Sequence, residues 1–167
     1  GQTETIKVDA LGVSGGWNPN LGLTGHHRAR PEWREEIEAF APGAGGVPGL
    51  QAVGAAAGLM STHAALKSGA ESAVAVATAL GKTANSDLPQ AEDAPVAIKA
   101  HWYVHGGKGR AWIDPQNDVT VKDVKLAFTE NYADIEHLKR YTTLGMATDQ
   151  GKLGNMAALG RLAEQQG

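Results

Sequence analysis

The sequence predicts an α/β fold, and three stretches carry this prediction. Residues 5–14, TIKVDALGVS, alternate apolar and polar side chains and are rich in Val, Ile and Leu, as strands are. Residues 50–53 form a second short apolar run, which predicts another strand. The Gly- and Ala-rich segment after it is predicted to lead into a helix of small residues that extends to about residue 80. Towards the end of the chain, apolar residues recur at helical spacing, which predicts helices between residues 120 and 165.

Composition excludes several classes of protein. The 167 residues are enough for one sizeable core, and the net charge of -3 gives no electrostatic case for nucleic acid or a membrane surface. The chain has no cysteine, which rules out disulfides and Cys-based zinc or iron–sulfur sites and fits a reducing compartment. It also lacks an apolar run of about 18 residues and a signal-like start. We therefore expect a cytoplasmic protein without a transmembrane helix.

Glycines and prolines mark turns in the first half of the chain. Gly15 and Gly16 follow the first predicted strand, as either a plain turn or a turn that faces a cofactor. Residues 31–40, PEWREEIEAF, begin with proline and acids and are predicted to form a short amphipathic helix with Trp33, Ile37 and Phe40 on its apolar face.

A Gly-rich segment follows the second predicted strand and begins with Gly54. A strand, a glycine and then a helix of small residues is a geometry in which a helix N-terminus faces a phosphate. Residues 42–48 begin like a dinucleotide fingerprint, but Pro48 occupies the place of its third glycine and no strand precedes it. We therefore reject the fingerprint there.

Residues 85–95, NSDLPQAEDAP, are polar and contain two prolines, so we expect a linker. Residues 98–104 and 111–114 are predicted to form a β-hairpin around a glycine-rich turn. Thr120 and Asp123 have the spacing of a capping box at the start of the next helix.

The histidines do not form a convincing metal site. His26 and His27 are neighbours whose side chains point apart, and His63 lies in an apolar helical stretch where packing or capping explains it. His101 and His105 could share one strand face, but no third ligand is near. A calcium loop that starts at residue 114 lacks the required glycine and glutamate.

Residues 135–155, IEHLKRYTTLGMATDQGKLGN, are the most informative stretch. Lys139, Arg140, Thr142 and Thr143 come at the end of a predicted helix, where two cations and two hydroxyl groups suit an anion. The alternative is a solvated helix face in which Arg140 pairs with an acid such as Asp149 and the threonines cap helix ends.

This stretch also carries a family resemblance. EHLKRYTTLGMATDQGK resembles the signature EHxKRYTTxGMxTDQGK of the alpha subunits of heterotetrameric sarcosine oxidases, and subunits of N-methylglutamate dehydrogenases are similar. IDPQNDVTVKDVKLA, residues 113–127, resembles the family's VDFQNDVTVKDVxLA.

The resemblance implies that this chain is an internal fragment. Residues 1–84 would be the C-terminal part of an FAD/NAD(P)-binding, Rossmann-like domain. Residues 85–95 would be a linker. Residues 96–167 would be a hairpin and helical connector leading toward a folate-binding, aminomethyltransferase-like domain that this chain does not contain.

The resemblance also implies cofactors. VDALGVSGGWNPN, residues 8–20, is similar to a late segment of flavoproteins with two dinucleotide domains. GLQAVGAAAG, residues 49–58, is similar to the closing motif of that fold, with Ala55 in place of its Asp, which fits NAD in the alpha subunit. FMN would lie at the alpha/beta interface, FAD in the beta subunit and tetrahydrofolate in the missing domain. No catalytic or metal-binding residue is expected, and the candidate cofactor-binding residues are Gly15, Gly16, Trp17, Gly54, Ala55, Lys139, Arg140, Thr142 and Thr143.

The implied function is oxidative demethylation of sarcosine to glycine with release of a one-carbon unit and peroxide. The fragment alone is expected to be inactive. Its implied partners are the other subunits of a heterotetramer, chiefly the flavin-bearing beta subunit, and a small amine substrate. The alternative is a non-catalytic scaffold or subunit-interaction module of a flavin-dependent N-methyl amino acid dehydrogenase.

Overall fold

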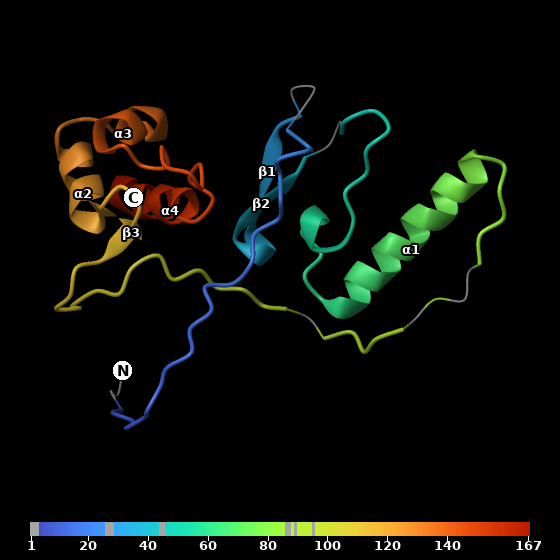
Figure 1. Cartoon of the computed structure of the whole chain (residues 1–167), viewed down its shortest axis with the longest axis horizontal. Helices are drawn as coiled ribbons and strands as arrows, with labels where there is room; N and C mark the ends of the chain where they lie inside the picture. The colour runs from blue at the N-terminus through green and yellow to red at the C-terminus, as the bar shows by residue number, and fades with distance from the viewer. Residues whose placement is uncertain (1–3, 26–28, 44–45, 86–87, 89, 95) are drawn as a thin grey trace. The chain divides into compact units, whose positions relative to one another are not determined.

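The computed structural model describes residues 4–25, 29–43, 46–85, 88, 90–94 and 96–167 (Figure 1). Over these residues the fold is mixed α/β, as predicted, with two antiparallel two-stranded sheets and four α-helices. The chain divides into two compact units, Gly1–Lys99 (unit 1) and Ala100–Gly167 (unit 2). Neither sheet is parallel, so a Rossmann-like domain stays a prediction.

A β-hairpin stands where the sequence predicted a helix over residues 31–40. Strand β1 (Pro31–Arg34) and strand β2 (Ala39–Pro42) are joined by the 3-10 helix η2 (Glu35–Ile37). Trp33 and Phe40 lie directly opposite each other, with ring centroids 5.2 Å apart in an edge-to-face contact. The helix prediction was wrong because the spacing of these two residues also suits a hairpin, whose cross-strand pair stabilises the turn between them.

The predicted strands at residues 5–14 and 50–53 are absent. The first segment runs as an extended trace without regular secondary structure (Figure 1), and its apolar side chains are exposed, Leu11 by 81% and Val13 by 83%. Both predictions were wrong because a strand forms only against a hydrogen-bonding neighbour, and within the described residues no segment pairs with either stretch.

The predicted helix of small residues is confirmed as α1 (Thr62–Ala79), which follows the 3-10 helix η3 (Gly54–Ala57). The side chain of Ser61 caps α1 by accepting a hydrogen bond from the Ala64 N–H at 3.1 Å. None of the residues of α1 is buried. Its tie to η3 includes a 2.9 Å hydrogen bond from the Gly54 N–H to the Ser68 hydroxyl.

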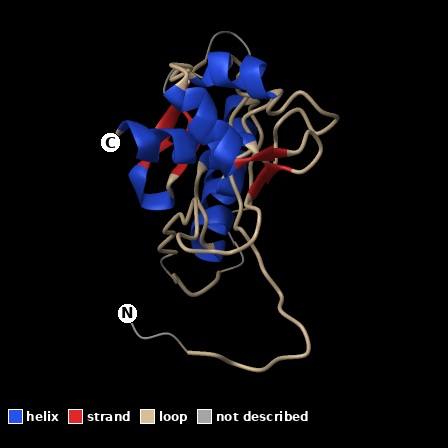
Figure 2. Ribbon diagram, turned by 90° about the vertical axis from the view of Figure 1, so that its left-hand side faces the viewer, coloured by secondary structure: helices blue, strands red, loops and turns tan. Residues whose placement is uncertain are grey.

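Unit 2 contains strands β3 (Trp112–Asp114) and β4 (Val119–Thr120) and helices α2 (Val121–Thr129), α3 (Ile135–Thr142) and α4 (Asn155–Gln166), shown by type in Figure 2. The three helices were predicted, whereas the hairpin was predicted with the wrong partner. Strand β3 pairs with β4, which follows it, and residues 98–104 form no strand. The short turn between β3 and β4 closes the pair locally, whereas the predicted hairpin depended on a flexible glycine-rich loop.

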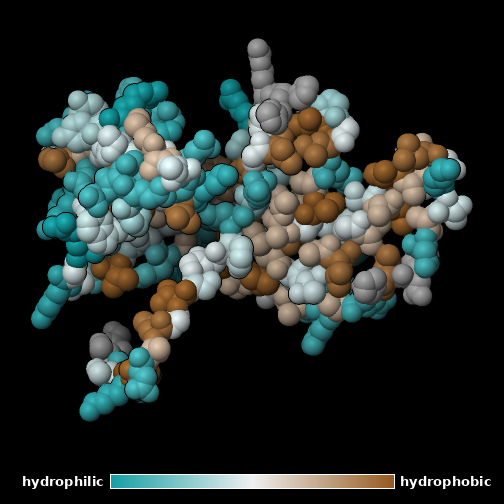
Figure 3. All heavy atoms as spheres, viewed as in Figure 1, coloured by the Kyte–Doolittle hydropathy of each residue, from teal (hydrophilic) through white to brown (hydrophobic). Residues whose placement is uncertain are grey.

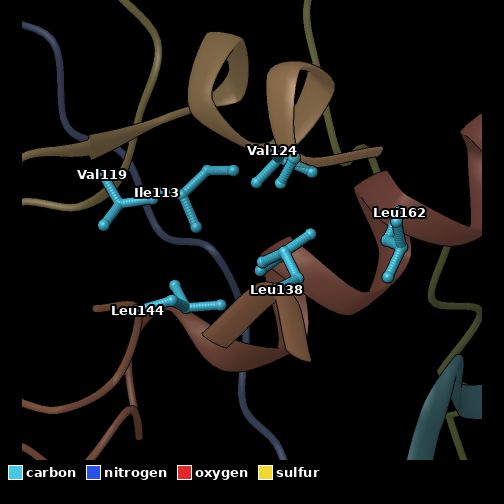
Figure 4. Close-up of a cluster of buried hydrophobic side chains, with 8 residues drawn as sticks. Ile113, Val119, Val124, Leu138, Leu144 and Leu162 are labelled. Atoms are coloured by element: carbon cyan, nitrogen blue, oxygen red, sulfur yellow. The ribbon is translucent and has the colours of Figure 1, made fainter. Parts of the chain in front are cut away.

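One hydrophobic core holds unit 2 together. Apolar side chains from both strands and all three helices converge between α2, α3 and α4 (Figure 4). The buried members are Ile113, Val119, Val124, Ala127, Leu138, Leu144, Ala158 and Leu162. This core fixes the ends of β3 and α3, which carry the candidate site.

The capping box at the start of α2 is confirmed. A carboxylate oxygen of Asp123 accepts hydrogen bonds from the Thr120 hydroxyl at 2.6 Å and from the Thr120 N–H at 2.8 Å. The hydroxyl bond favours the ionised carboxylate and lowers the pKa of Asp123 below its ordinary value. The cap therefore contributes most when Asp123 is charged.

Candidate functional site

A buried carboxylate organises the candidate site in unit 2. Asp114, at the end of β3, is 4% exposed. One of its oxygens accepts hydrogen bonds from the N–H groups of Gln116 and Asn117 at 3.0 and 3.3 Å, and the other accepts from the Gly145 N–H at 2.9 Å. Asp114 thus joins the turn after β3 to the loop after α3, and bonds to a charged acceptor are stronger than neutral ones.

Two further hydrogen bonds fasten the same loops. The Asn117 side-chain amide donates to the Thr143 carbonyl oxygen at 2.8 Å, and the Thr148 hydroxyl donates to the Gln116 side-chain oxygen at 2.7 Å. Together with the bonds of Asp114 they form what we call the Asp114 clamp. The clamp holds residues 143–148 against residues 114–117.

Glycines let this loop pass close to α4. Gly145 has φ +66, and a Cβ on it would overlap the Asn155 side chain at the start of α4. The same is true of Gly151, with φ +77. The stretch that the sequence singled out is therefore a tightly packed loop, and substitution at either glycine would open it.

The structure gives Arg140 a different acid from the one expected. Its guanidinium donates to the Glu136 carbonyl oxygen at 2.8 Å and lies 3.6 Å from the Glu136 carboxylate, with both side chains exposed. Asp149 instead accepts hydrogen bonds from the N–H groups of Gly151 and Leu153, both at 3.2 Å. An exposed pair of this kind contributes little to stability, so the Arg140 charge stays available to a ligand.

Both threonines use their hydroxyl hydrogens inside the loop. Thr142 donates to the Leu138 carbonyl oxygen at 2.8 Å, and Thr143 donates to the Thr142 carbonyl oxygen at 2.6 Å. The end of α3 is also the negative end of its macrodipole, which Lys139 and Arg140 compensate from the last turn. An anion at this place would therefore be held by the two cationic side chains rather than by the hydroxyls or the helix.

The candidate residues of unit 1 lie in two separate elements. Gly15, Gly16 and Trp17 belong to the exposed extended segment, where Gly16 has φ +85 and Trp17 is 84% exposed. Gly54 and Ala55 begin η3, and the Gly54 N–H is already bonded to Ser68. Ala55 has no polar side chain, so it offers a ligand its backbone alone.

Two histidine side chains, those of His63 and His105, take part in local contacts. The His63 ring nitrogen Nδ1 lies 3.0 Å from the Ala91 carbonyl oxygen, and the His105 ring meets the Tyr103 ring edge-on at 4.8 Å. His26 and His27 lie outside the described residues. Within the part of the chain that the structure describes, no three His, Asp or Glu side chains gather in a way that could hold a metal ion. Likewise, no helix there is long and apolar enough to cross a bilayer.

Sequence reasoning missed the role of Asp114. It was weighed only as a calcium ligand, whereas the structure makes it the acceptor that joins two loops. The local half of this role had a signal, because an Asp followed by Pro, Gln and Asn is typical of an Asx turn. The hydrogen bond from the Gly145 N–H to Asp114 had no signal in the sequence.

Comparison with known proteins relates both units to one family. Residues 108–167, which include all of the Asp114 clamp, match the family described as "Sarcosine oxidase A3 domain". The "Sarcosine oxidase subunit alpha" of Rhizobium meliloti (strain 1021) is 42% identical over 177 aligned residues, which include the whole of this chain. The chain is homologous to a segment of the sarcosine oxidase alpha subunit.

Other relatives carry the same name. The "Sarcosine oxidase subunit alpha" proteins of Corynebacterium sp. (strain P-1) and Corynebacterium sp. (strain U-96) are each 35% identical over 171 aligned residues, covering 98% of this chain. The chain spans 17% of the length of the Rhizobium protein and 18% of each Corynebacterium protein. The homology therefore covers both units of this chain and a minor part of each relative.

Proposed function

We propose that this chain is part of the alpha subunit of a sarcosine oxidase-type oxidoreductase. The whole enzyme would demethylate sarcosine oxidatively to glycine, releasing a one-carbon unit and peroxide. The observation that carries the proposal is the 42% identity to a sarcosine oxidase alpha subunit along the entire chain. The match of residues 108–167 to the A3 domain family supports it independently of any single relative.

Within such an enzyme, unit 2 would be a connector that positions cofactors and partner subunits rather than reacting groups. Its core and the Asp114 clamp support this role, because they hold the loop after α3 in one conformation. Apart from the bond between Thr148 and Gln116, every hydrogen bond of the clamp satisfies a backbone N–H or C=O group, as expected for a structural connection between two loops.

Two cofactor contacts belong to the same proposal. Lys139 and Arg140 would face the phosphate of an FMN between the alpha and beta subunits, since their charge fits an anion and the Arg140 pair with Glu136 is solvent-exposed. Thr142 and Thr143 fit less well, because their hydroxyl hydrogens are used internally. In unit 1, Gly15, Gly16, Trp17, Gly54 and Ala55 would lie beside NAD. FAD and tetrahydrofolate would bind parts of the enzyme outside this chain.

A specific observation favours a second role, that of a subunit-interaction module. The loop between α3 and α4 is held in place, yet Met146 is 51% exposed and Leu153 is 77% exposed on it. Apolar side chains on a fixed loop are suited to contact with another protein. The flavin-bearing beta subunit would be the partner.

The experiment uses the complete enzyme, purified with its subunits. Replacing both Lys139 and Arg140 by Ala should lower bound FMN while the subunits stay assembled. The double replacement of Lys122 and Lys125 by Ala is the matched control, because it also removes two exposed cations from one helix. The flavin spectrum and the subunit stoichiometry are read on the same sample.

Separate measurements test the proposed reaction and the proposed FMN contact independently. Sarcosine-dependent peroxide formation by the unmodified enzyme tests the reaction. If the enzyme oxidises another N-methyl amino acid and leaves sarcosine untouched, the reaction proposed here is wrong. Full FMN occupancy in the double variant would leave the reaction standing and remove Lys139 and Arg140 from the cofactor site.

A further inference from the structure

Unit 2 contains a hollow that the proposed function does not use. Its volume is about 310 Å³, and the loop before β3 forms most of its wall, together with Val121 and Ala157. Pockets that bind small molecules begin at roughly 300 Å³. The hollow is therefore large enough for a compact ligand.

Aromatic rings line the hollow, and the protein holds two of them in place. Trp102 lies against α4 at Gly160, where a Cβ would overlap the indole ring. Tyr103 lies under the Arg161 guanidinium, 4.9 Å from the ring centroid. Trp112, which begins β3, supplies a third ring. These rings give the hollow flat walls on which a planar ligand could stack.

The charge on the wall has one sign. Arg110 lines the hollow, with its guanidinium 5.2 Å from the Trp112 ring centroid. No Asp or Glu is among the lining residues, and within the described residues Arg110 has no carboxylate at ion-pair distance. His101 adds a second nitrogen-bearing side chain to the same wall. The nearest acid in effect is Asp123, outside the wall, whose pKa is lowered mainly by the Thr120 hydrogen bond and to a lesser degree by the Arg110 charge. An arginine that makes no salt bridge and stacks on an aromatic ring is suited to a phosphate or carboxylate group.

We propose that this hollow binds a planar heteroaromatic anion of mononucleotide size. The ring of the ligand stacks on Trp102 and Trp112, and its anionic group pairs with Arg110. Neither feature alone defines the ligand: the aromatic walls select a flat ring, and Arg110, which makes no salt bridge among the described residues, selects negative charge.

The chain carries its own reporters for the test. It has four tryptophans, and each gives an indole N–H signal in a nitrogen–proton correlation spectrum that single Trp→Phe variants assign. The full 167-residue chain is titrated with AMP, with adenosine, and with ribose 5-phosphate. Saturable shifts of the Trp102 and Trp112 signals with AMP are expected, while Trp33, in the hairpin of unit 1, stays unmoved. Adenosine lacks the anion and ribose 5-phosphate lacks the ring, so each should bind more weakly.

Variants assign the anion contact. Arg110→Ala should weaken AMP binding roughly tenfold, as expected for the loss of one charge-assisted contact. Lys125→Ala changes the net charge equally and should leave binding unchanged. If Arg110→Ala disturbs the spectrum of the free protein, Arg110→Lys serves instead, and a smaller loss is expected because the charge is kept without the planar fork.

Some outcomes would refute the proposed site, and others would identify the ring system that it binds. The site is refuted if neither the Trp102 nor the Trp112 signal shifts, if the Trp33 signal shifts together with them, or if Lys125→Ala weakens binding as much as Arg110→Ala. A titration with FMN distinguishes the two ring systems. A stronger response to FMN than to AMP, or the reverse, supports the site and assigns a flavin or a purine to it.

Discussion

Units 1 and 2 differ in how their helices are held. In unit 2, eight buried apolar residues from two strands, three helices and the loop after α3 form one core. Among the described residues of unit 1, the buried apolar side chains are Pro19, Ile37, Ala39 and Ala41, and the last three lie in the hairpin. Helix α1, with 18 residues, buries none. Packing therefore accounts for the helices of unit 2, whereas the propensity of alanine and the Ser61 cap account for α1.

The difference bears on the proposed function. Apolar residues crowd the surface of unit 1 along its extended segment and α1, and the space-filling view shows them as brown patches (Figure 3). Exposed apolar side chains grouped in this way are typical of a surface that contacts another protein or domain. In the proposed alpha subunit, other parts of the protein would cover it. Unit 2 needs no such cover for its core.

The largest predicted effect contrasts two leucines. Leu138→Ala in α3 should destabilise unit 2 by about 4 kcal/mol, because Leu138 is fully buried in the core. Leu80→Ala, at the end of α1, should change stability by less than about 0.5 kcal/mol, because that side chain is 71% exposed. Urea unfolding followed at the Trp102 and Trp112 indole signals measures unit 2, and helical circular dichroism follows the whole chain. Equal losses for the two variants would abolish the distinction between the units.

The second prediction concerns the clamp. Asp114→Ala should destabilise unit 2 by about 3 kcal/mol, because the buried Gly145 N–H and the partly buried N–H groups of Gln116 and Asn117 lose their acceptor. Asp93→Ala, at an exposed position of unit 1, is the control and should have no measurable effect. The Gly145 amide should also exchange faster with solvent in the Asp114 variant. Unchanged exchange at Gly145 would mean that the clamp does not hold the loop.

A pair of helical glycines sharpens the comparison further. Gly69→Ala in α1 should stabilise that helix by up to about 1 kcal/mol, because nothing lies within 4 Å of the new methyl group. Gly160→Ala in α4 should destabilise unit 2 by about 1–2 kcal/mol, because the methyl group displaces Trp102. The Trp102 indole signal should move in the second variant alone. A gain in stability from both substitutions would show that Trp102 is not packed on α4.

The smallest predicted effect depends on pH. The hydrogen bond from the Thr120 hydroxyl lowers the pKa of Asp123 in the folded chain, so its stabilisation is present above the ordinary carboxyl pKa of about 4 and is lost as pH falls through the lowered value. The carboxylate faces solvent, so we expect about 0.5 kcal/mol, the low end for a helix cap. Asp123→Asn should cost this amount at pH 7 and nothing at about pH 2, where both side chains are neutral. Stability curves of the two proteins that stay parallel across this range would contradict the prediction.

Much of unit 2 could be predicted from sequence, because its signals are local. The apolar positions of α2 repeat at helical spacing, and Thr120 and Asp123 mark where that helix begins. The hairpin of unit 1 was missed because the spacing of Trp33 and Phe40 suits either a helix or a cross-strand pair. The segment at residues 5–14 has the composition of a strand, but composition does not supply the neighbour that a strand needs.

In the candidate site too, local features could be predicted from the sequence, whereas contacts between distant residues could not. The sequence indicated Lys139 and Arg140 as cations at a helix end, and the structure places them there. It could not show that the Thr142 and Thr143 hydroxyls are used by nearby carbonyl groups, since that depends on how the loop turns. The contact between Asp114 and Gly145 joins residues 31 positions apart and is set by the core.

Amide hydrogen exchange on the intact chain tests the contrast between the units most directly. Exchange protection reports the local free energy of opening at each N–H group. The account predicts strong protection in α2, α3 and α4, including the Gly145 amide, and weak protection in α1 and residues 4–20. Protection in α1 equal to that in α2 would contradict it, because among the described residues α1 contributes no buried side chain to a core.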